Sequence, residues 1–141
     1  MRKLTILLPL MLAAAFALAG CRATVPVKNV DGAVYGPITA SPGTQLTLDD
    51  YERAIIRAGS ERNWIFERAG PGHLVGTNNV RGKHTAVVDV TFDTESFSID
   101  YKDSSNLKWD SSKRTIHPNY NAWVDLLKAD IQAEIQRMRS G

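Results

Sequence analysis

Two runs of alternating apolar residues, joined by a short polar turn, most strongly constrain how this 141-residue chain can fold. The first run carries Ala86, Val88, Val90 and Phe92 at every second position, and the return run carries Phe97, Ile99 and Tyr101 in the same way. An apolar residue at every second position is typical of a strand with one buried face. The polar residues Asp93-Thr94-Glu95-Ser96 stand between the two runs. The sequence therefore predicts an antiparallel hairpin with one apolar face.

The register of this hairpin follows if Thr94 and Glu95 form a two-residue loop. On the apolar face the register pairs Phe92 with Phe97, Val90 with Ile99 and Val88 with Tyr101. On the opposite face it pairs Thr91 with Ser98, Asp89 with Asp100 and Val87 with Lys102. We expect a sheet that buries one face and leaves the mixed face in contact with water.

Helical patterns flank the β segments. Thr47-Leu48-Asp49-Asp50 places an acid three residues after a capping hydroxyl, and apolar residues follow at helical spacing, which predicts a helix over 48–60. Pro118 suits the first turn of a second helix. Apolar residues then recur every three or four positions as far as Met138, so this helix should pack on the apolar sheet face.

Two further strands are predicted before the hairpin, over 63–69 and from His73 to Thr77, with Gly70-Pro71-Gly72 as the turn between them and a second turn over 78–82. The chain should therefore form a two-layer α+β domain of order α-β-β-β-β-α. In this domain an antiparallel meander of about four strands carries two helices packed on one face.

The N-terminus has the pattern of an export signal. Arg2 and Lys3 precede an apolar run over 4–19, then Gly20 and the chain's single cysteine, Cys21. This run is short and close to the terminus for an ordinary membrane-spanning helix. Leu18-Ala19-Gly20-Cys21 resembles the lipobox of bacterial lipoproteins, and the resemblance implies a lipid on the Cys21 sulfur and cleavage between Gly20 and Cys21. The alternatives are an ordinary secretory signal with a chance cysteine, or an uncut anchor.

The residue after the cysteine bears on which membrane holds the lipid. In lipoproteins of this kind an Asp at that position typically retains the protein at the inner membrane, and here the position is Arg22. The resemblance therefore implies anchoring in the outer membrane, with the domain facing the periplasm. Segments 101–107 and 116–123 also resemble small uncharacterised periplasmic lipoproteins of Gram-negative bacteria, a resemblance that implies no particular activity.

These patterns divide the chain into a signal peptide over 1–20, a lipidated N-terminus with a tether over 21–46, and a globular domain over 47–141. The tether carries several prolines and glycines, and residues 34–38 could add an edge strand. Fully extended at about 3.3 Å per residue, residues 22–45 would span roughly 80 Å, which would hold the domain clear of the bilayer.

Charge excludes one class of partner. The chain has 17 basic and 15 acidic residues, and loss of Arg2 and Lys3 with the leader leaves the two signs equal. Nucleic-acid binding needs clustered Lys and Arg, so scattered charges in a neutral chain give it no electrostatic basis. We expect the partners to be the membrane, through the N-terminal lipid, and an envelope protein.

Two groups of residues are candidates for metal or proton chemistry. His73, His84 and His117 lie at no metal-ligand spacing, and we expect turn or capping residues rather than a metal site. Asp89 and Asp100 are predicted to face each other, which suggests a cation site, a shared-proton acid pair, or a pair screened by water and by Lys102, which is diagonal to Asp89.

A polar recess is a further candidate. Segments 102–107 and 116–121 are dense in hydrogen-bonding side chains and flank the link between the last strand and the last helix. Candidate binding residues there are Ser104, His117, Asn119 and Asn121, although Asn and Ser in such places usually form turns and caps.

No sequence motif supports catalysis. The chain has no Gly-x-Ser-x-Gly elbow, no phosphate-binding Gly-rich loop and no His-Glu-x-x-His segment. We therefore expect neither an enzyme nor a cofactor. The leading hypothesis is a lipid-anchored periplasmic accessory or scaffold protein of the cell envelope, acting through protein contacts on its open sheet face or polar recess. The alternative is a periplasmic binding module for a small ligand or metal ion.

Overall fold

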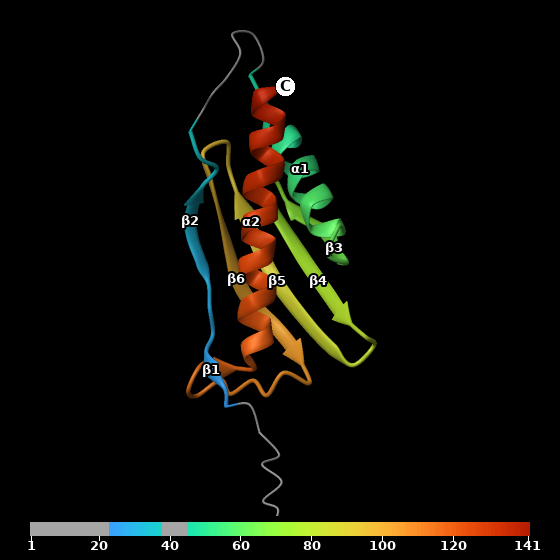
Figure 1. The fold of residues 1–141 in the computed structure, drawn as a ribbon, viewed down its shortest axis with the longest axis vertical. Helices are drawn as coiled ribbons and strands as arrows, with labels where there is room; N and C mark the ends of the chain where they lie inside the picture. Colours follow the sequence, from blue (N-terminus) through green and yellow to red (C-terminus); the bar gives the residue numbers. More distant parts are fainter. Residues whose placement is uncertain (1–22, 38–44) are drawn as a thin grey trace, which may run out of the picture.

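The computed structural model describes residues 23–37 and 45–141, which form two sheets and two helices (Figure 1). In chain order the elements are β1 (Val25–Pro26), β2 (Val30–Val34), α1 (Leu48–Ser60), β3 (Trp64–Gly70), β4 (His73–Val80), β5 (His84–Phe92), β6 (Ser96–Ser105), β7 (Thr115–Ile116) and α2 (Pro118–Ser140). The predicted α+β class is confirmed, and the predicted order α-β-β-β-β-α corresponds to α1, β3 to β6, and α2.

Five antiparallel strands form the main sheet in the order β2-β6-β5-β4-β3, and the meander from β3 to β6 was predicted. In the β5–β6 hairpin the three apolar pairs, the Thr91–Ser98 pair and the Asp89–Asp100 pair are confirmed. The predicted pairing of Val87 with Lys102 is wrong, because Val87 lies opposite Asp103 and the register shifts between Val87 and Val88. Lys102 is thus the extra residue of a β-bulge, which a period-two pattern cannot reveal.

Both helices lie on the same face of the sheet, as expected (Figure 1). Thr47 caps α1 in a complete capping box with Asp50, and the helix has the predicted bounds. His117 caps α2, where its side chain accepts a hydrogen bond from the backbone N–H of Asn119. The buried apolar side chains of α2 share one core with those of β5 and β6, and this core includes Leu127, Ile131, Val88 and Ile99.

The predicted tether extends too far into the chain, because residues 25–26 and 30–34 form strands. β1 pairs with β7, and β2 pairs with the outer edge of β6. Val30 and Tyr35 are 5% and 1% exposed and belong to the core. The edge strand expected over 34–38 is therefore β2, four residues earlier. A two-residue strand and a strand with a register shift lack the alternation by which strands are predicted.

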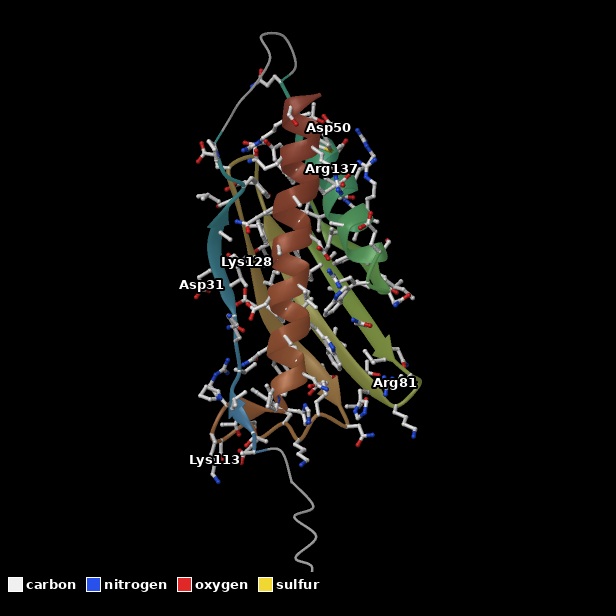
Figure 2. The ribbon with its side chains drawn as sticks, viewed as in Figure 1. Asp31, Asp50, Arg81, Lys113, Lys128 and Arg137 are labelled. Atoms are coloured by element: carbon white, nitrogen blue, oxygen red, sulfur yellow. The ribbon has the colours of Figure 1, made fainter. Side chains whose placement is uncertain are left out.

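The leader, Cys21 and residues 38–44 of the predicted tether lie outside the described residues. Within the described ranges, no helix combines the length and the apolar character that crossing a bilayer requires. Figure 2 shows Arg81 and Lys113 toward the end of the domain that holds β1, and Asp50 and Arg137 toward the opposite end.

Candidate functional site

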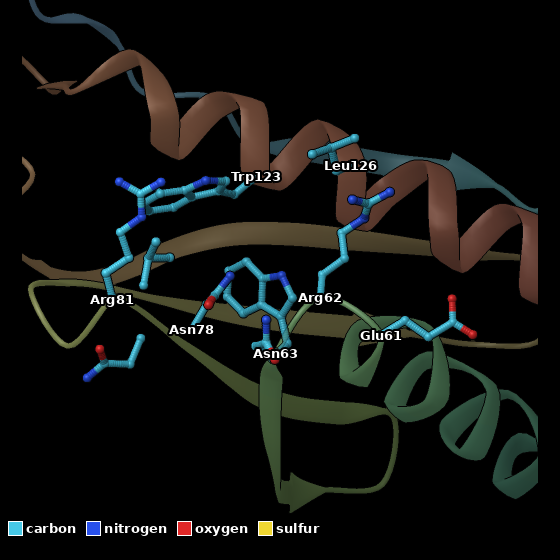
Figure 3. Close-up of a pocket in the computed structure, with 10 residues that line it drawn as sticks. Glu61, Arg62, Asn63, Asn78, Arg81, Trp123 and Leu126 are labelled. Atoms are coloured by element: carbon cyan, nitrogen blue, oxygen red, sulfur yellow. The ribbon is translucent and has the colours of Figure 1, made fainter.

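A cleft of about 470 Å³ opens between α2 and the part of β3 and β4 that α1 does not cover (Figure 3). The turn after α1, the start of β3, the end of β4 and one face of α2 contribute its walls. The side chains that line it include Glu61, Arg62, Asn63, Trp64, Asn78, Arg81, Trp123 and Leu126. Two indoles, amides and two guanidinium groups therefore line one cavity.

Local backbone geometry places these side chains. Trp64 and Asn78 lie directly opposite each other across β3 and β4, so both point to the helix-covered face of the sheet. Asn63 and Arg81 have left-handed backbone conformations, with φ of 64° and 57°, where the chain turns into β3 and out of β4. Asn tolerates this conformation better than most residues, whereas an arginine there is uncommon.

Buried polar groups mark the cleft as more than a packing gap. Asn78 is only 5% exposed, and Figure 3 shows its side chain pointing into the cleft. Trp64 is 2% exposed, and its indole Nε1 is buried with no hydrogen-bond partner among the residues that the structure describes. A buried donor without an acceptor costs about 1–3 kcal/mol. An acceptor brought by a ligand would remove that cost.

The two arginines of the cleft differ in their partners. Arg62 forms an ion pair with Asp130 of α2, with 3.4 Å between Arg62 Nη2 and Asp130 Oδ1. Arg81 is exposed and forms no ion pair with any described residue. Arg81 is therefore the cation of this cleft that is available to an anionic group.

The predicted opposition of Asp89 and Asp100 on the outer sheet face is confirmed, but their partners differ. Asp89 Oδ1 lies 2.6 Å from His73 Nε2, and Asp89 Oδ2 lies 3.1 Å from Lys102 Nζ. Burial raises the pKa of Asp89, but hydrogen bonds from His73 and Lys102 outweigh burial and hold the pKa below its usual range. Burial, together with the charges of Asp31 and Asp89, raises the pKa of Asp100.

These opposite shifts predict opposite effects of neutralisation. At pH 7, Asp100→Asn should stabilise the fold and Asp89→Asn should destabilise it. A raised folded-state pKa gives stability at low pH that is lost as pH rises through that pKa, so ionised Asp100 is unfavourable at neutral pH. A lowered pKa gives stability above the unfolded value that is lost as pH falls, so the Asp89→Asn penalty should shrink toward pH 3.

Urea unfolding of both variants at pH 7 and pH 3 measures these effects. Because both groups are partly exposed, each change should stay below about 1 kcal/mol. Shifts of the same sign for the two variants at pH 7 would contradict the assignment of Lys102 and His73 to Asp89.

The residues of the predicted polar recess form links within the fold. Ser104 Oγ lies 2.9 Å from the Tyr101 hydroxyl, and Asn119 donates its backbone N–H to the capping side chain of His117 at 3.1 Å. The Asn121 amide accepts from the backbone N–H of Lys28 and donates to the carbonyl of Pro26, each at 2.9 Å. Asn121 therefore joins α2 to the N-terminal strand segment.

The three histidines lie in separate surroundings. His73 contacts Asp89, His84 Nδ1 lies 2.8 Å from the carbonyl oxygen of Asn106, and His117 caps α2. Among the described residues, no group of three or more His, Cys, Asp or Glu side chains is arranged to hold a metal ion.

Sequence reasoning missed the cleft because it assigned Asn78 to a turn. Residues 78–82 were predicted as a turn, but β4 continues to Val80, so Asn78 is a strand residue facing the helices. An asparagine at a buried strand position was the available signal, and it was masked by the usual preference of Asn for turns.

Comparisons with known proteins identify no family for this chain. No protein-family model matches the chain, and the comparisons with curated proteins and with solved structures also return no match.

Proposed function

We propose that this chain is a lipid-anchored accessory protein of the cell envelope, held in the outer membrane and facing the periplasm, which acts by binding rather than by catalysis. The observation that carries the proposal is Leu18-Ala19-Gly20-Cys21 at the end of a basic and apolar leader. The only thiol of the chain stands at the one position where a lipid would be attached. Two or three acyl chains give an effectively permanent anchor, since each buried methylene adds about 0.8 kcal/mol.

The test compares the intact mass and membrane fractionation of wild type, Cys21→Ala and Arg22→Asp. Wild type should carry acyl mass in the outer membrane, and Cys21→Ala should lose that mass and keep its leader. Arg22→Asp serves as the matched control, because it should keep the acyl mass and move to the inner membrane. Wild type without acyl mass would overturn the proposal.

A second function is favoured by the cleft, namely binding of a small carboxylate-bearing glycan. Trp123 is partly exposed at the mouth, and indole faces suit the flat apolar side of a sugar ring. Asn78 can exchange hydrogen bonds with hydroxyl and acetamido groups, and Arg81 can bind a carboxylate. Among the described side chains that line the cleft, Glu61 is the one carboxylate and there is no histidine to pair with it, so these residues support binding rather than acid–base catalysis.

Chemical-shift titration with N-acetylmuramic acid, and with N-acetylglucosamine as the sugar lacking the carboxylate, tests this function. We expect shifts in cleft residues for both sugars and tighter binding of the acid. Arg81→Gln should reduce the preference for the acid by about tenfold, consistent with a charged hydrogen bond, and Trp123→Ala should weaken both. Arg68→Gln, which removes an exposed arginine outside the cleft, is the control.

Either of two results would contradict glycan binding at the cleft. One is the absence of shifts in cleft residues with both sugars. The other is equal affinity of wild type and Trp123→Ala.

A further inference from the structure

Positively charged side chains gather at the end of the domain that holds β1. Three segments form this basic end: the β1–β7 pair, the β4–β5 turn and the loop over 106–114 (Figures 1 and 2). Its exposed cations are Arg81, Lys83, Lys108, Lys113 and Arg114. The sequence does not reveal this grouping, because the residues come from two stretches about 25 positions apart.

Hydrogen bonds tie these segments into one surface. The backbone N–H of Val27, just after β1, donates to the carbonyl of Arg114 at 2.9 Å. At the other end of the loop, the Asn106 amide donates to the carbonyl of Lys83 at 3.0 Å. The β4–β5 turn, the loop and the N-terminal strand are therefore held side by side.

The cations of this end differ from those elsewhere in the described part of the chain. None of the five forms an ion pair with a described residue. Of the nine described lysines and arginines outside this end, all but Lys128 and Arg139 pair with a carboxylate, namely Lys28, Arg53, Arg57, Arg62, Arg68, Lys102 and Arg137. Two carboxylates accompany these cations, Asp110 in the loop and Asp103 near the end of β6, which leaves a net charge of three positive units. Asp103 accepts a hydrogen bond from the backbone N–H of Ser104, and Asp110 accepts from the backbone N–H groups of Ser112 and Lys113, so neither accepts from a cation's charged group.

The position of Cys21 brings this end close to a membrane. β1 begins at Val25, four residues after Cys21. Four residues span at most about 14 Å when fully extended. A lipid on Cys21 would therefore hold the β1–β7 pair within about two Debye lengths of the headgroups, which excludes the distance of roughly 80 Å expected from a long tether.

We propose that the basic end is a second membrane contact, in which these cations lie against the anionic phospholipid headgroups of the leaflet that holds the Cys21 lipid. This inference rests on the proposed lipid anchor. The contact orients the domain upright on the membrane, with α1 and the β5–β6 turn directed away from it. Arg81 lies on the same end and also lines the cleft, so the cleft opens close to the headgroup layer.

Vesicle binding by the mature chain, residues 21–141 carrying Cys21→Ala, tests the contact without any lipid on the protein. This chain keeps every described residue. It should sediment with phosphatidylglycerol-containing vesicles at 50 mM salt, bind pure phosphatidylcholine vesicles much less, and lose binding at 300 mM salt. Lys108→Gln with Lys113→Gln should lower the partition coefficient about tenfold or more, since each cation near an anionic surface contributes about fivefold.

The matched control is Arg53→Gln with Lys128→Gln, which changes the net charge equally. Arg53 lies in α1, and Figure 2 shows Lys128 midway along α2, away from the basic end. This control should lower the partition coefficient by less than about threefold, because charges far from the surface are screened. Equal losses for the two double variants, or equal binding to neutral and anionic vesicles, would overturn the inference.

Failure of the contact and failure of the anchor give different results. If wild type carries acyl mass but the Cys21→Ala chain does not bind vesicles, the proposed lipid anchor is supported and the proposed second contact is rejected. If the Cys21→Ala chain binds vesicles but wild type is unlipidated, the proposed lipid anchor is rejected. The basic end would then bind anionic lipid by itself, which overturns its proposed role as a second contact.

Discussion

Leu127→Ala should lower the free energy of unfolding by about 2–5 kcal/mol, whereas Leu126→Ala should lower it by less than about 1 kcal/mol. The two leucines are neighbours on α2, but Leu127 is 0% exposed and Leu126 is 41% exposed. Truncation of the buried side chain removes apolar contacts and leaves a cavity in the core between α2 and the sheet. Urea unfolding at a fixed pH measures both values.

Leu126→Ala is a strict control, since helix propensity, residue type and position along α2 are almost the same. Similar losses for the two variants would show that α2 does not bury the face that the structure assigns to it. Leu126 also lines the cleft, so its variant can be used in the sugar titrations once it is known to be folded.

Gly76→Ala should destabilise the domain by about 1–3 kcal/mol, although alanine is usually preferred to glycine in a strand interior. A Cβ at Gly76 would lie 2.6 Å from Phe66 Cε1 and 3.3 Å from Val88 Cγ2. The Phe66 ring also closely approaches Gly59 of α1, so it fills a space between two glycines. The ring has little room to move away from an added methyl group.

Gly70→Ala is the matched control, because a Cβ there would meet nothing within 4 Å. Its effect should be below about 1 kcal/mol. Combining Gly76→Ala with Phe66→Leu should cost less than the sum of the two single changes, since the smaller side chain relieves the contact. If the two stability changes were strictly additive, or if Gly76→Ala left the stability unchanged, the packing of the Phe66 ring would not depend on the two glycines.

The β5–β6 hairpin and both helices could be predicted because each is encoded within a short stretch of chain. The alternation from Ala86 to Tyr101 determines which side chains share a face, and the capping box at Thr47 and Asp50 marks where α1 begins. The bulge at Lys102 escaped prediction. When one strand contains an extra residue, the alternating pattern on either side of it is compatible with more than one pairing register.

Arg139 shows how a local pattern can be correct and incomplete. The sequence places it in the last turn of α2, where the helix dipole favours a cation. In the structure its guanidinium also lies 5.3 Å from the ring centre of Tyr35 and 3.0 Å from the Tyr51 hydroxyl, and it donates to the carbonyl of Gly36. The two hydrogen bonds cross 88 and 103 residues of chain, so no local pattern could reveal them.

The candidate sites were also predicted only in part, because some of their contacts join distant segments of the chain. Register alone predicted that Asp89 and Asp100 face each other, but His73, the partner that helps to lower the pKa of Asp89, comes from the neighbouring strand. The cleft exists because α1 ends at Ser60 and leaves part of β3 and β4 uncovered. Its location depends on how two helices divide one sheet face.

The amino-acid sequence was sufficient for the leader pattern ending at Cys21, the two helices, the meander and the apolar face, because each follows from the periodicity or end signals of a continuous segment. Tertiary structure was needed for the incorporation of β1 and β2 into the sheets, the cleft around Trp64 and the basic end. Each of these joins segments that are distant in the chain. Such pairings depend on which edges, faces and ends remain unoccupied after the local elements have packed, and that is a property of the whole fold.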